Sequence, residues 1–278
     1  MLLPGVLAVS HLAAPDKAAS VVWGFHGFSL SPPLAMPMAG AWWGAVAIVS
    51  ALGLSNPLKY SPVFLMQVLY KVLFLGHLVA TGQLTSAPAA PTAVFFSYLL
   101  PLFTCSPWSY LLGGSPLTSC QPSDRANCPP RSIAAQEPAM AVTIESRMRF
   151  LFTLNLVVVG TLAAKHLAAP ASAASSFWGA PTGASLSPPL ALPLVGSFYG
   201  AVALASLLGL RSPLKFSPVF LMQVMYKLLF LGRLAATGQL VSVLTPEWAP
   251  FTAYLLPLLA CSPWSYLLGG GRARDKAE

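Results

Sequence analysis

The hydrophobic positions of the chain form long continuous runs that are separated by short polar turns. The clearest runs lie in the C-terminal half and are about 20 residues long, enough to cross a hydrocarbon core of roughly 30 Å. They predict four membrane-spanning helices, over Arg149–Ala168, Leu192–Leu210, Pro218–Ala236 and Pro250–Leu268. Matching runs in the N-terminal half predict helices over Leu2–Ala14, Met36–Leu54, Pro62–Ala80 and Thr92–Leu112, and the first of these is too short to span comfortably.

Local signals set the ends of these helices and their contacts. A serine followed by proline predicts the start of each third helix, at Pro62 and Pro218. Prolines inside the fourth helices predict a kink or break there. In the second helices, small residues at a four-residue spacing would let another helix approach closely, and these packing positions are Gly40, Gly44, Gly196 and Gly200.

The two halves repeat one another in sequence. Ser29–Leu84 matches Ser185–Leu240 with about 40 of 56 positions identical, which is the signature of an internal repeat. The match resumes at Tyr98–Gly114 against Tyr254–Gly270. We therefore predict an all-α membrane protein made by tandem duplication of a four-helix unit, with about eight helices in total. Because four is an even number, the two units are expected to be parallel repeats.

The repeat divides the chain into four parts. Residues 1–114 form the first unit, whose first helix is truncated at its N-terminus, and residues 147–270 form the second unit. Residues 115–146 between them are rich in proline, serine and charge, and are predicted to be a disordered linker. Residues 271–278 are a basic tail. Met140 precedes a segment that the first unit lacks, so the duplication is either a true fusion or two neighbouring genes read as one.

Composition assigns these runs to a membrane. The chain is 56% hydrophobic and 8% charged, whereas a soluble domain carries about 25% charged residues. This deficit fits a surface that faces lipid, so the bilayer is the expected partner. The net charge of +8 would also fit nucleic acid, but the cations lie singly between apolar runs and form no basic patch. We therefore expect no nucleic-acid binding.

The positions of the cations also predict a topology. Most of them fall on the side shared by the linker, the loops between the second and third helices, and the C-terminus: Lys59, Arg125, Arg131, Arg147, Arg149, Arg211, Lys215, Arg272, Arg274 and Lys276. Cytoplasmic loops carry such an excess of lysine and arginine. The linker and the C-terminus are therefore predicted to be cytoplasmic, or on the equivalent side of an organelle membrane.

One lysine lies in the middle of each predicted third helix. Lys71 follows Pro62 by nine residues, about 14 Å along a helix, and Lys227 is its counterpart. A central lysine costs about 2.5–3.5 kcal/mol on insertion scales. A glutamine lies one turn before each lysine, where its amide oxygen can reach the ammonium. With the adjacent tyrosines this gives a candidate ligand-binding set of Gln67, Tyr70, Lys71, Gln223, Tyr226 and Lys227.

No acidic residue falls inside a predicted span, so no carboxylate can neutralise either lysine there. This argues against a retinal Schiff base, which needs a counter-ion, and against a proton relay of the Asp or Glu kind. The simplest interpretation is a structural lysine that snorkels or is satisfied in the bundle. The alternatives are an ammonium bound to carbonyls of the proline-broken fourth helix, an uncharged lysine, or contact with an anionic ligand or lipid headgroup.

No catalytic or metal site is predicted from the remaining polar residues. His11 and His166 are expected to end the first helices near a water interface. His77 becomes Arg233 in the second unit, and no other histidine pair has metal-site spacing. The cysteines lie in apolar segments or in the linker and are expected to be free thiols: Cys105, Cys120, Cys128 and Cys261.

The unit resembles the DoxX-like small four-helix membrane proteins. The shared features are a first helix that ends in HLAAPDKAASVVWG or HLAAPASAASSFWG, a glycine-containing second helix, and a short cationic turn, NPLKYSP or SPLKFSP. Some members of that group are linked to sulfur-compound or quinone redox chemistry. We expect a non-catalytic integral membrane protein, either a structural or accessory subunit beside other membrane subunits or a module that binds lipid or a small ligand. The alternative is a small-solute carrier or a redox-associated membrane enzyme of the DoxX-like kind.

Overall fold

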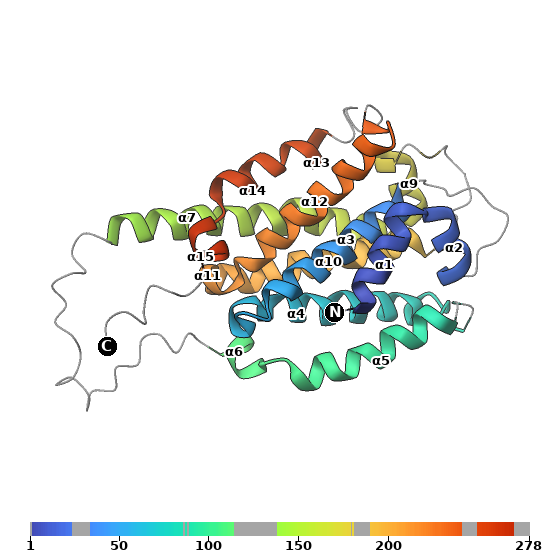
Figure 1. Ribbon diagram of the computed structural model, residues 1–278, viewed down its shortest axis with the longest axis horizontal. Helices are drawn as coiled ribbons and strands as arrows, with labels where there is room; N and C mark the ends of the chain where they lie inside the picture. The colour runs from blue at the N-terminus through green and yellow to red at the C-terminus, as the bar shows by residue number, and fades with distance from the viewer. Residues whose placement is uncertain are drawn as a thin grey trace.

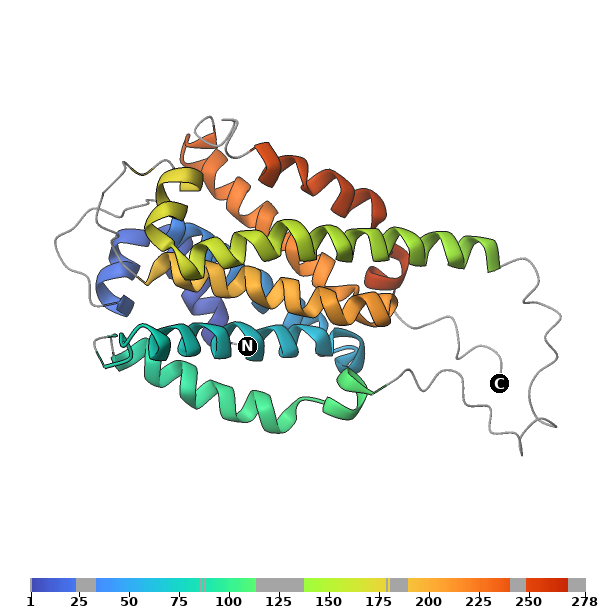
Figure 2. The same cartoon turned by 180° about the vertical axis from the view of Figure 1, so that it is seen from behind.

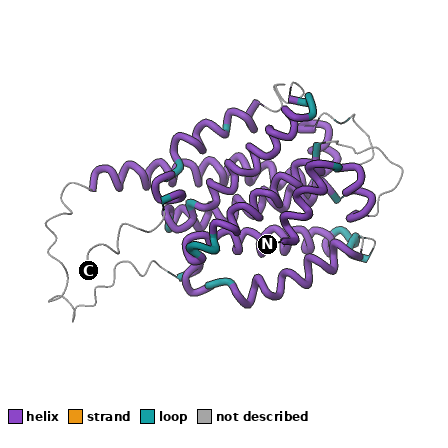
Figure 3. Tube along the Cα trace, viewed as in Figure 1, coloured by secondary structure: helices purple, strands orange, loops and turns teal. Residues whose placement is uncertain are grey.

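The computed structural model describes residues 2–23, 34–85, 87, 89–113, 138–178, 180, 190–240 and 249–269. Within these ranges every regular element is a helix (Figure 3). Five described segments are long and apolar enough to cross a membrane: Ala35–Leu52, Pro57–Ala80, Ile144–Ala168, Ala191–Arg211 and Pro213–Ala236. The predicted all-α class is confirmed, and these five helices are compatible with a membrane protein. Three other apolar helices are shorter than predicted: Leu3–Ala13, Thr92–Cys105 and Phe251–Cys261.

The helices follow one another in a similar order in both halves. The N-terminal half contains α1 (Leu2–Ala13), α2 (Pro15–Trp23), α3 (Ala35–Leu52), α4 (Pro57–Ala80), α5 (Ala89–Cys105) and α6 (Trp108–Leu112). The C-terminal half begins with a continuous rod of α7 (Pro138–Leu154), the π-helical segment η4 (Asn155–Val159) and α8 (Gly160–Ala168). It continues with α9 (Pro170–Trp178), α10 (Ala191–Arg211), α11 (Pro213–Phe216), α12 (Pro218–Ala236), α13 (Ala249–Ala253), α14 (Leu255–Cys261) and α15 (Trp264–Leu268).

The third helix of the N-terminal half starts earlier than predicted. Asn56 caps α4, because its side chain accepts a hydrogen bond of 3.2 Å from the backbone N–H of Lys59, and a proline occupies the first turn. Pro62 therefore lies inside α4 and not at its start. In the C-terminal half Ser212 makes no such side-chain cap. There a turn at Ser217 separates the short α11 from α12, which begins at Pro218 as predicted.

The first helix of the C-terminal half reaches into the predicted linker. Residues 115–137 lie outside the described residues, as does the basic tail, but 138–146 belong to α7. Proline is favourable at the start of a helix. About two turns after Pro138, Glu145 pairs with Arg149 at 3.0 Å, which supports helix at the predicted linker boundary.

Each fourth helix breaks at the second of its two prolines, as predicted, whereas Pro101 lies inside α5 and Pro257 inside α14. α5 ends at Cys105 and Pro107 precedes α6, while Pro263 separates α14 from α15. A further turn at Tyr254 divides α13 from α14. Proline removes a backbone donor and clashes with the preceding turn, and this explains why neither fourth helix reaches spanning length.

The halves pack together in a crossed arrangement. α3 lies against α12 of the other half, and α10 lies against α4, whereas α3 with α4 and α10 with α12 make few contacts (Figures 1 and 2). A Cβ added to Gly44 would lie 2.7 Å from Cδ1 of Leu229 in α12. A Cβ added to Gly200 would lie 2.7 Å from Cδ1 of Leu73 in α4. These two glycines therefore admit a leucine from the opposite half.

The other two glycines of the predicted motifs lie against the first helices. A Cβ on Gly40 would lie 2.7 Å from the Cβ of His11, and a Cβ on Gly196 would lie 2.7 Å from the Cβ of His166. This close approach draws both histidines into the bundle, where they are 0% and 1% exposed. Both histidines lie in the last turn of their helices, as predicted, but their side chains are packed inside the bundle.

Candidate ligand-binding cavity

Lys71 lies in the interior of α4 and is held by its neighbours. It is 2% exposed, and its Nζ donates a hydrogen bond of 2.9 Å to the Tyr70 hydroxyl and one of 3.4 Å to the backbone carbonyl of Gln67. The rings of Tyr70 and Tyr98 lie 4.2 and 5.0 Å from Nζ. Aromatic faces attract a cation, so oxygen atoms and rings together stabilise this buried ammonium.

Lys227 of α12 is equally buried but is bound differently. Its Nζ donates a hydrogen bond of 3.0 Å to the carbonyl of Phe251, whose ring centre lies 3.5 Å away. Phe251 belongs to α13, just before the turn at Tyr254. Among the described residues Nζ makes no hydrogen bond to Tyr226. Of the interpretations left open by the sequence, the geometry at Lys227 matches an ammonium bound to a carbonyl of the broken fourth helix.

The predicted contact between glutamine amide and lysine ammonium is not formed. Gln67 and Gln223 are 2% and 0% exposed. Within the described ranges, the Gln67 Oε1 atom and both side-chain polar atoms of Gln223 have no hydrogen-bond partner. The reason is the direction of the lysine side chains, which extend toward aromatic residues of α5 and α13. The candidate set therefore divides into two kinds of residue. The lysines contact aromatic side chains, and the glutamines have buried side-chain atoms without a hydrogen-bond partner.

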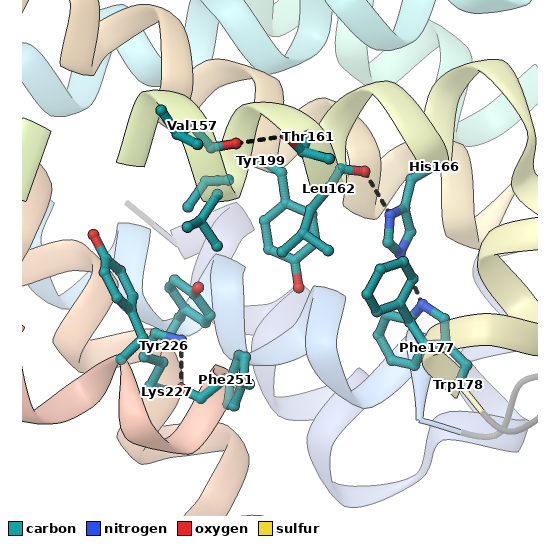
Figure 4. A pocket seen from close by; sticks show the side chains of 13 residues that line it. Val157, Thr161, Leu162, His166, Phe177, Trp178, Tyr199, Tyr226, Lys227 and Phe251 are labelled. Carbon is teal, nitrogen blue, oxygen red and sulfur yellow. Dashed lines mark hydrogen bonds between the residues drawn. The ribbon is translucent and has the colours of Figure 1, made fainter. Parts of the chain in front are cut away.

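A cavity of about 390 Å³ opens beside Lys227. Its walls come from η4 and helices α8, α9, α10, α12 and α13, with Tyr254 beside them, and are mostly aliphatic or aromatic. Figure 4 shows Lys227 and Phe251 at one end, His166 and Trp178 at the other, and Tyr199 between them. Such an apolar enclosure with a few polar groups is typical of a small-molecule site.

His166, at the end of the cavity away from Lys227, is fixed by two hydrogen bonds. Its Nδ1 lies 2.7 Å from the Leu162 carbonyl, and its Nε2 accepts a hydrogen bond of 2.8 Å from the indole Nε1 of Trp178. The first contact requires a proton on Nδ1 and the second requires none on Nε2, so the ring is the neutral Nδ1–H tautomer. His11 and Trp23 repeat this contact at 3.0 Å. These pairs hold α2 and α9 against the first helices, which the sequence did not predict.

Asn155 is a buried residue of the site that the sequence analysis missed. It opens the π-helical segment η4, and its Nδ2 donates a hydrogen bond of 3.0 Å to Ser206 of α10. Its Oδ1 accepts a hydrogen bond from the hydroxyl of Tyr254, which lines the cavity. Short π-helical segments occur often at functional sites. The sequence signal that could have identified Asn155 is its polar side chain inside the predicted span Arg149–Ala168.

The corresponding place in the N-terminal half is divided. A space of only about 10 Å³ lies beside Lys71. A separate apolar space of about 230 Å³ lies beyond it, and Lys71 is not among the residues that line this second space. Trp43 lines both spaces and aligns with Tyr199 of the large cavity. The indole of Trp43 is larger than the phenol of Tyr199 and packs edge-on against His11, with the ring centres 4.8 Å apart. Two similar sequences therefore produce one open and one closed site.

Aromatic rings connect the two lysine regions through the centre of the bundle. The ring of Tyr70 lies 4.6 Å from Phe198, which stacks on Trp42 at 4.8 Å. Trp42 in turn lies 4.8 Å from Tyr226. Because these residues alternate between the halves, the crossed packing of the helices and the walls of the two sites are built from the same side chains.

Lys227 is the one lysine among the residues that line the cavity, and no acidic side chain accompanies it there. In the described ranges no acidic residue lines it, since Asp16 is exposed and Glu145 pairs with Arg149 on the surface. In the same ranges no group of three potential metal ligands occurs. The arrangement can hold an anionic or hydrogen-bond-accepting group at the lysine and an apolar body against the aromatic walls.

Comparison with protein-family models, with curated proteins and with solved structures gives no match.

Proposed function

We propose that the chain is a non-catalytic integral membrane protein that binds one small amphiphile with a single acidic headgroup in the cavity beside Lys227. The observation that carries this proposal is a 2% exposed ammonium at the wall of a 390 Å³ apolar cavity. A charge in a low-dielectric surrounding gains most from a partner of opposite sign. The described part of the chain supplies no carboxylate there, so the ligand would supply the negatively charged group.

The volume of the cavity supports a small ligand. At roughly 30 Å³ per water-sized group, 390 Å³ holds about 13 non-hydrogen atoms. A fatty acid of medium chain length, such as decanoate, has about this size. Its alkyl chain would lie along the aliphatic and aromatic walls, where burying each methylene contributes about 0.8 kcal/mol.

The polar groups at the lysine end support a carboxylate or a similar headgroup. An ammonium group has three donors, and Lys227 uses one of them for the Phe251 carbonyl. Tyr226, next to Lys227 in the sequence, also lines the cavity. Two lysine donors are thus available to one headgroup.

We further infer that the chain is a tandem duplication of parallel four-helix units with its linker and C-terminus on the cytoplasmic side. The matching His–Trp contacts and the reciprocal glycine–leucine contacts support the duplication. The lysines of the turns support a common orientation, because Lys59 donates to the Gly269 carbonyl at 3.3 Å and Lys215 donates to the Gly113 carbonyl at 3.0 Å. Each cationic turn thereby meets the end of the fourth helix of the other half.

The test is equilibrium binding of decanoate to the purified full-length protein in delipidated detergent micelles. Lys227→Met is the test variant, and Lys71→Met is its matched control. We expect one decanoate per chain for the wild type and for the control. Binding to Lys227→Met should be about 10- to 150-fold weaker, because a hydrogen bond to a charged group contributes about 1.5–3 kcal/mol. Equal affinity of the two variants, or no saturable binding, would contradict the proposal.

A further inference from the structure

The end of the cavity away from Lys227 is formed by aromatic rings. His166, Phe177 and Trp178 lie there, and Figure 4 shows them at the opposite end from Lys227 and Phe251. The rings of Phe177 and His166 are stacked, with their centres 6.0 Å apart and their planes at 29°. An apolar chain that runs along the cavity from Lys227 would therefore meet these rings with its far end.

Phe177 lies between the cavity and the surface of the protein. It lines the cavity but is itself partly exposed. The ammonium of Lys165, an exposed residue that is not among those lining the cavity, lies 4.9 Å from the centre of its ring. Because an aromatic face attracts a cation, Lys165 and the stacked imidazole of His166 both favour this position of the ring.

The ring nitrogens at this end are already engaged within the protein. Nδ1 of His166 donates to the Leu162 carbonyl at 2.7 Å, and Nε2 accepts from the indole of Trp178 at 2.8 Å. A neutral imidazole and an indole have one N–H each, so neither ring has a further donor for a ligand. A charged group placed beside them would be buried without a partner, which is costly. This end of the cavity therefore suits an apolar terminus.

The rod gives the length of the cavity. Its lining residues run from Val157 to His166, which is about 14 Å along a helix at 1.5 Å per residue. A volume of about 390 Å³ spread over this length is a narrow, elongated space. Such a space fits one unbranched chain better than a branched or ring-shaped molecule of the same volume.

We propose that Phe177 sets the length of the ligand, and that the site selects unbranched monocarboxylic acids no longer than about decanoate over longer acids and over dicarboxylic acids. This inference rests on the fatty-acid binding proposed above. The carboxylate lies at Lys227, the chain follows the rod, and the methyl end contacts Phe177 and Trp178. A longer acid would have to displace the Phe177 ring, and a dicarboxylic acid would place a second charge beside His166.

The test compares the affinities of the purified full-length protein for octanoate, decanoate, dodecanoate and tetradecanoate, each referred to the free acid in water. A buried methylene contributes about fourfold in affinity. For the wild type we expect this gain from octanoate to decanoate and no further gain for the longer acids. In Phe177→Ala the gain should continue, so that tetradecanoate binds at least about tenfold more tightly than decanoate. The matched control is Phe150→Ala, the same substitution at a 59% exposed position of α7 outside the cavity, which should keep the wild-type profile.

A second measurement uses the wild type alone and so does not depend on the folding of a variant. Decanedioate should bind at least about tenfold more weakly than decanoate, because its second carboxylate would be buried without a partner. Equal affinity for these two acids, a wild-type gain that continues to tetradecanoate, or the same length profile in folded Phe177→Ala as in the wild type would each overturn the inference. Binding of none of the acids by the wild type would instead contradict the proposed function, so the two failures are distinguishable.

Discussion

Exchanging one aromatic residue between the halves should move the ligand site. Tyr199 lines the open cavity, and its counterpart Trp43 lines both of the small spaces on the other side. In Tyr199→Trp, the indole should divide the cavity as Trp43 does. In Trp43→Tyr, the reverse change should join the spaces of about 230 and 10 Å³ beside Lys71. The pair of variants is reciprocal, and each serves as a control for the other.

The magnitude follows from the volumes. Twelve non-hydrogen atoms of decanoate at about 0.5 kcal/mol each, with the headgroup contact included, contribute about 6 kcal/mol. The sum of about 6 kcal/mol corresponds to a Kd of about 40 µM. A lysine compartment of 10 Å³, as in the N-terminal half, is smaller than one atom of ligand at roughly 30 Å³ each. Tyr199→Trp should therefore raise the Kd above about 1 mM.

The assay is calorimetric titration of decanoate into each purified variant, with thermal unfolding as the control for folding. We expect no measurable binding to Tyr199→Trp, and for Trp43→Tyr a second, weaker site in addition to the first. The reasoning would be refuted if Tyr199→Trp, folded as judged by its melting temperature, bound decanoate with the affinity of the wild type.

The remaining predictions concern stability. Gly196→Ala should destabilise the protein by about 1–3 kcal/mol, because the new methyl group would lie 2.7 Å from the Cβ of His166; Gly232→Ala, which has nothing within 4 Å, should not. The melting temperature of fluorescent fusions in detergent reports both, and an equal shift would disprove the close approach. Asn155→Leu should cost about 1–2 kcal/mol by leaving its serine and tyrosine partners unpaired. Thr161→Val, which loses only a bond to its own helix, should be nearly neutral by denaturant titration.

The helical class could be predicted from the sequence, because the length of the apolar runs decides it. The sequence placed each lysine at the middle of a helix but left open whether it snorkels or is buried in the bundle. The crossed packing could not be predicted. A continuous apolar run shows that a helix is buried, but it does not say which helix lies against it, and the Gly44 motif fits a partner from either half equally well. The start of α4 also differs from the prediction. Asn56 caps the helix, which therefore begins at Pro57 and not at Pro62.

The candidate site was predicted in part. Lys71, Lys227 and their adjacent tyrosines lie together as expected from the sequence, whereas the glutamines do not reach the ammonium groups. The two cavities differ in volume, and one of their differing wall residues is a tryptophan in place of a tyrosine, whose neighbours in space the sequence does not show. The resemblance to DoxX-like proteins and their redox chemistry stays a prediction.

The most direct measurement of the central claim is photolabelling with a decanoic acid that carries a diazirine on its chain, followed by mapping of the labelled peptides by mass spectrometry. Labelling should concentrate on cavity residues of the C-terminal half, such as Phe177 and Tyr199, and unlabelled decanoate should compete it away. It should also disappear in Lys227→Met and persist in Lys71→Met. Labels spread over lipid-facing residues such as Phe96, or shared equally by the two halves, would contradict a specific site at Lys227.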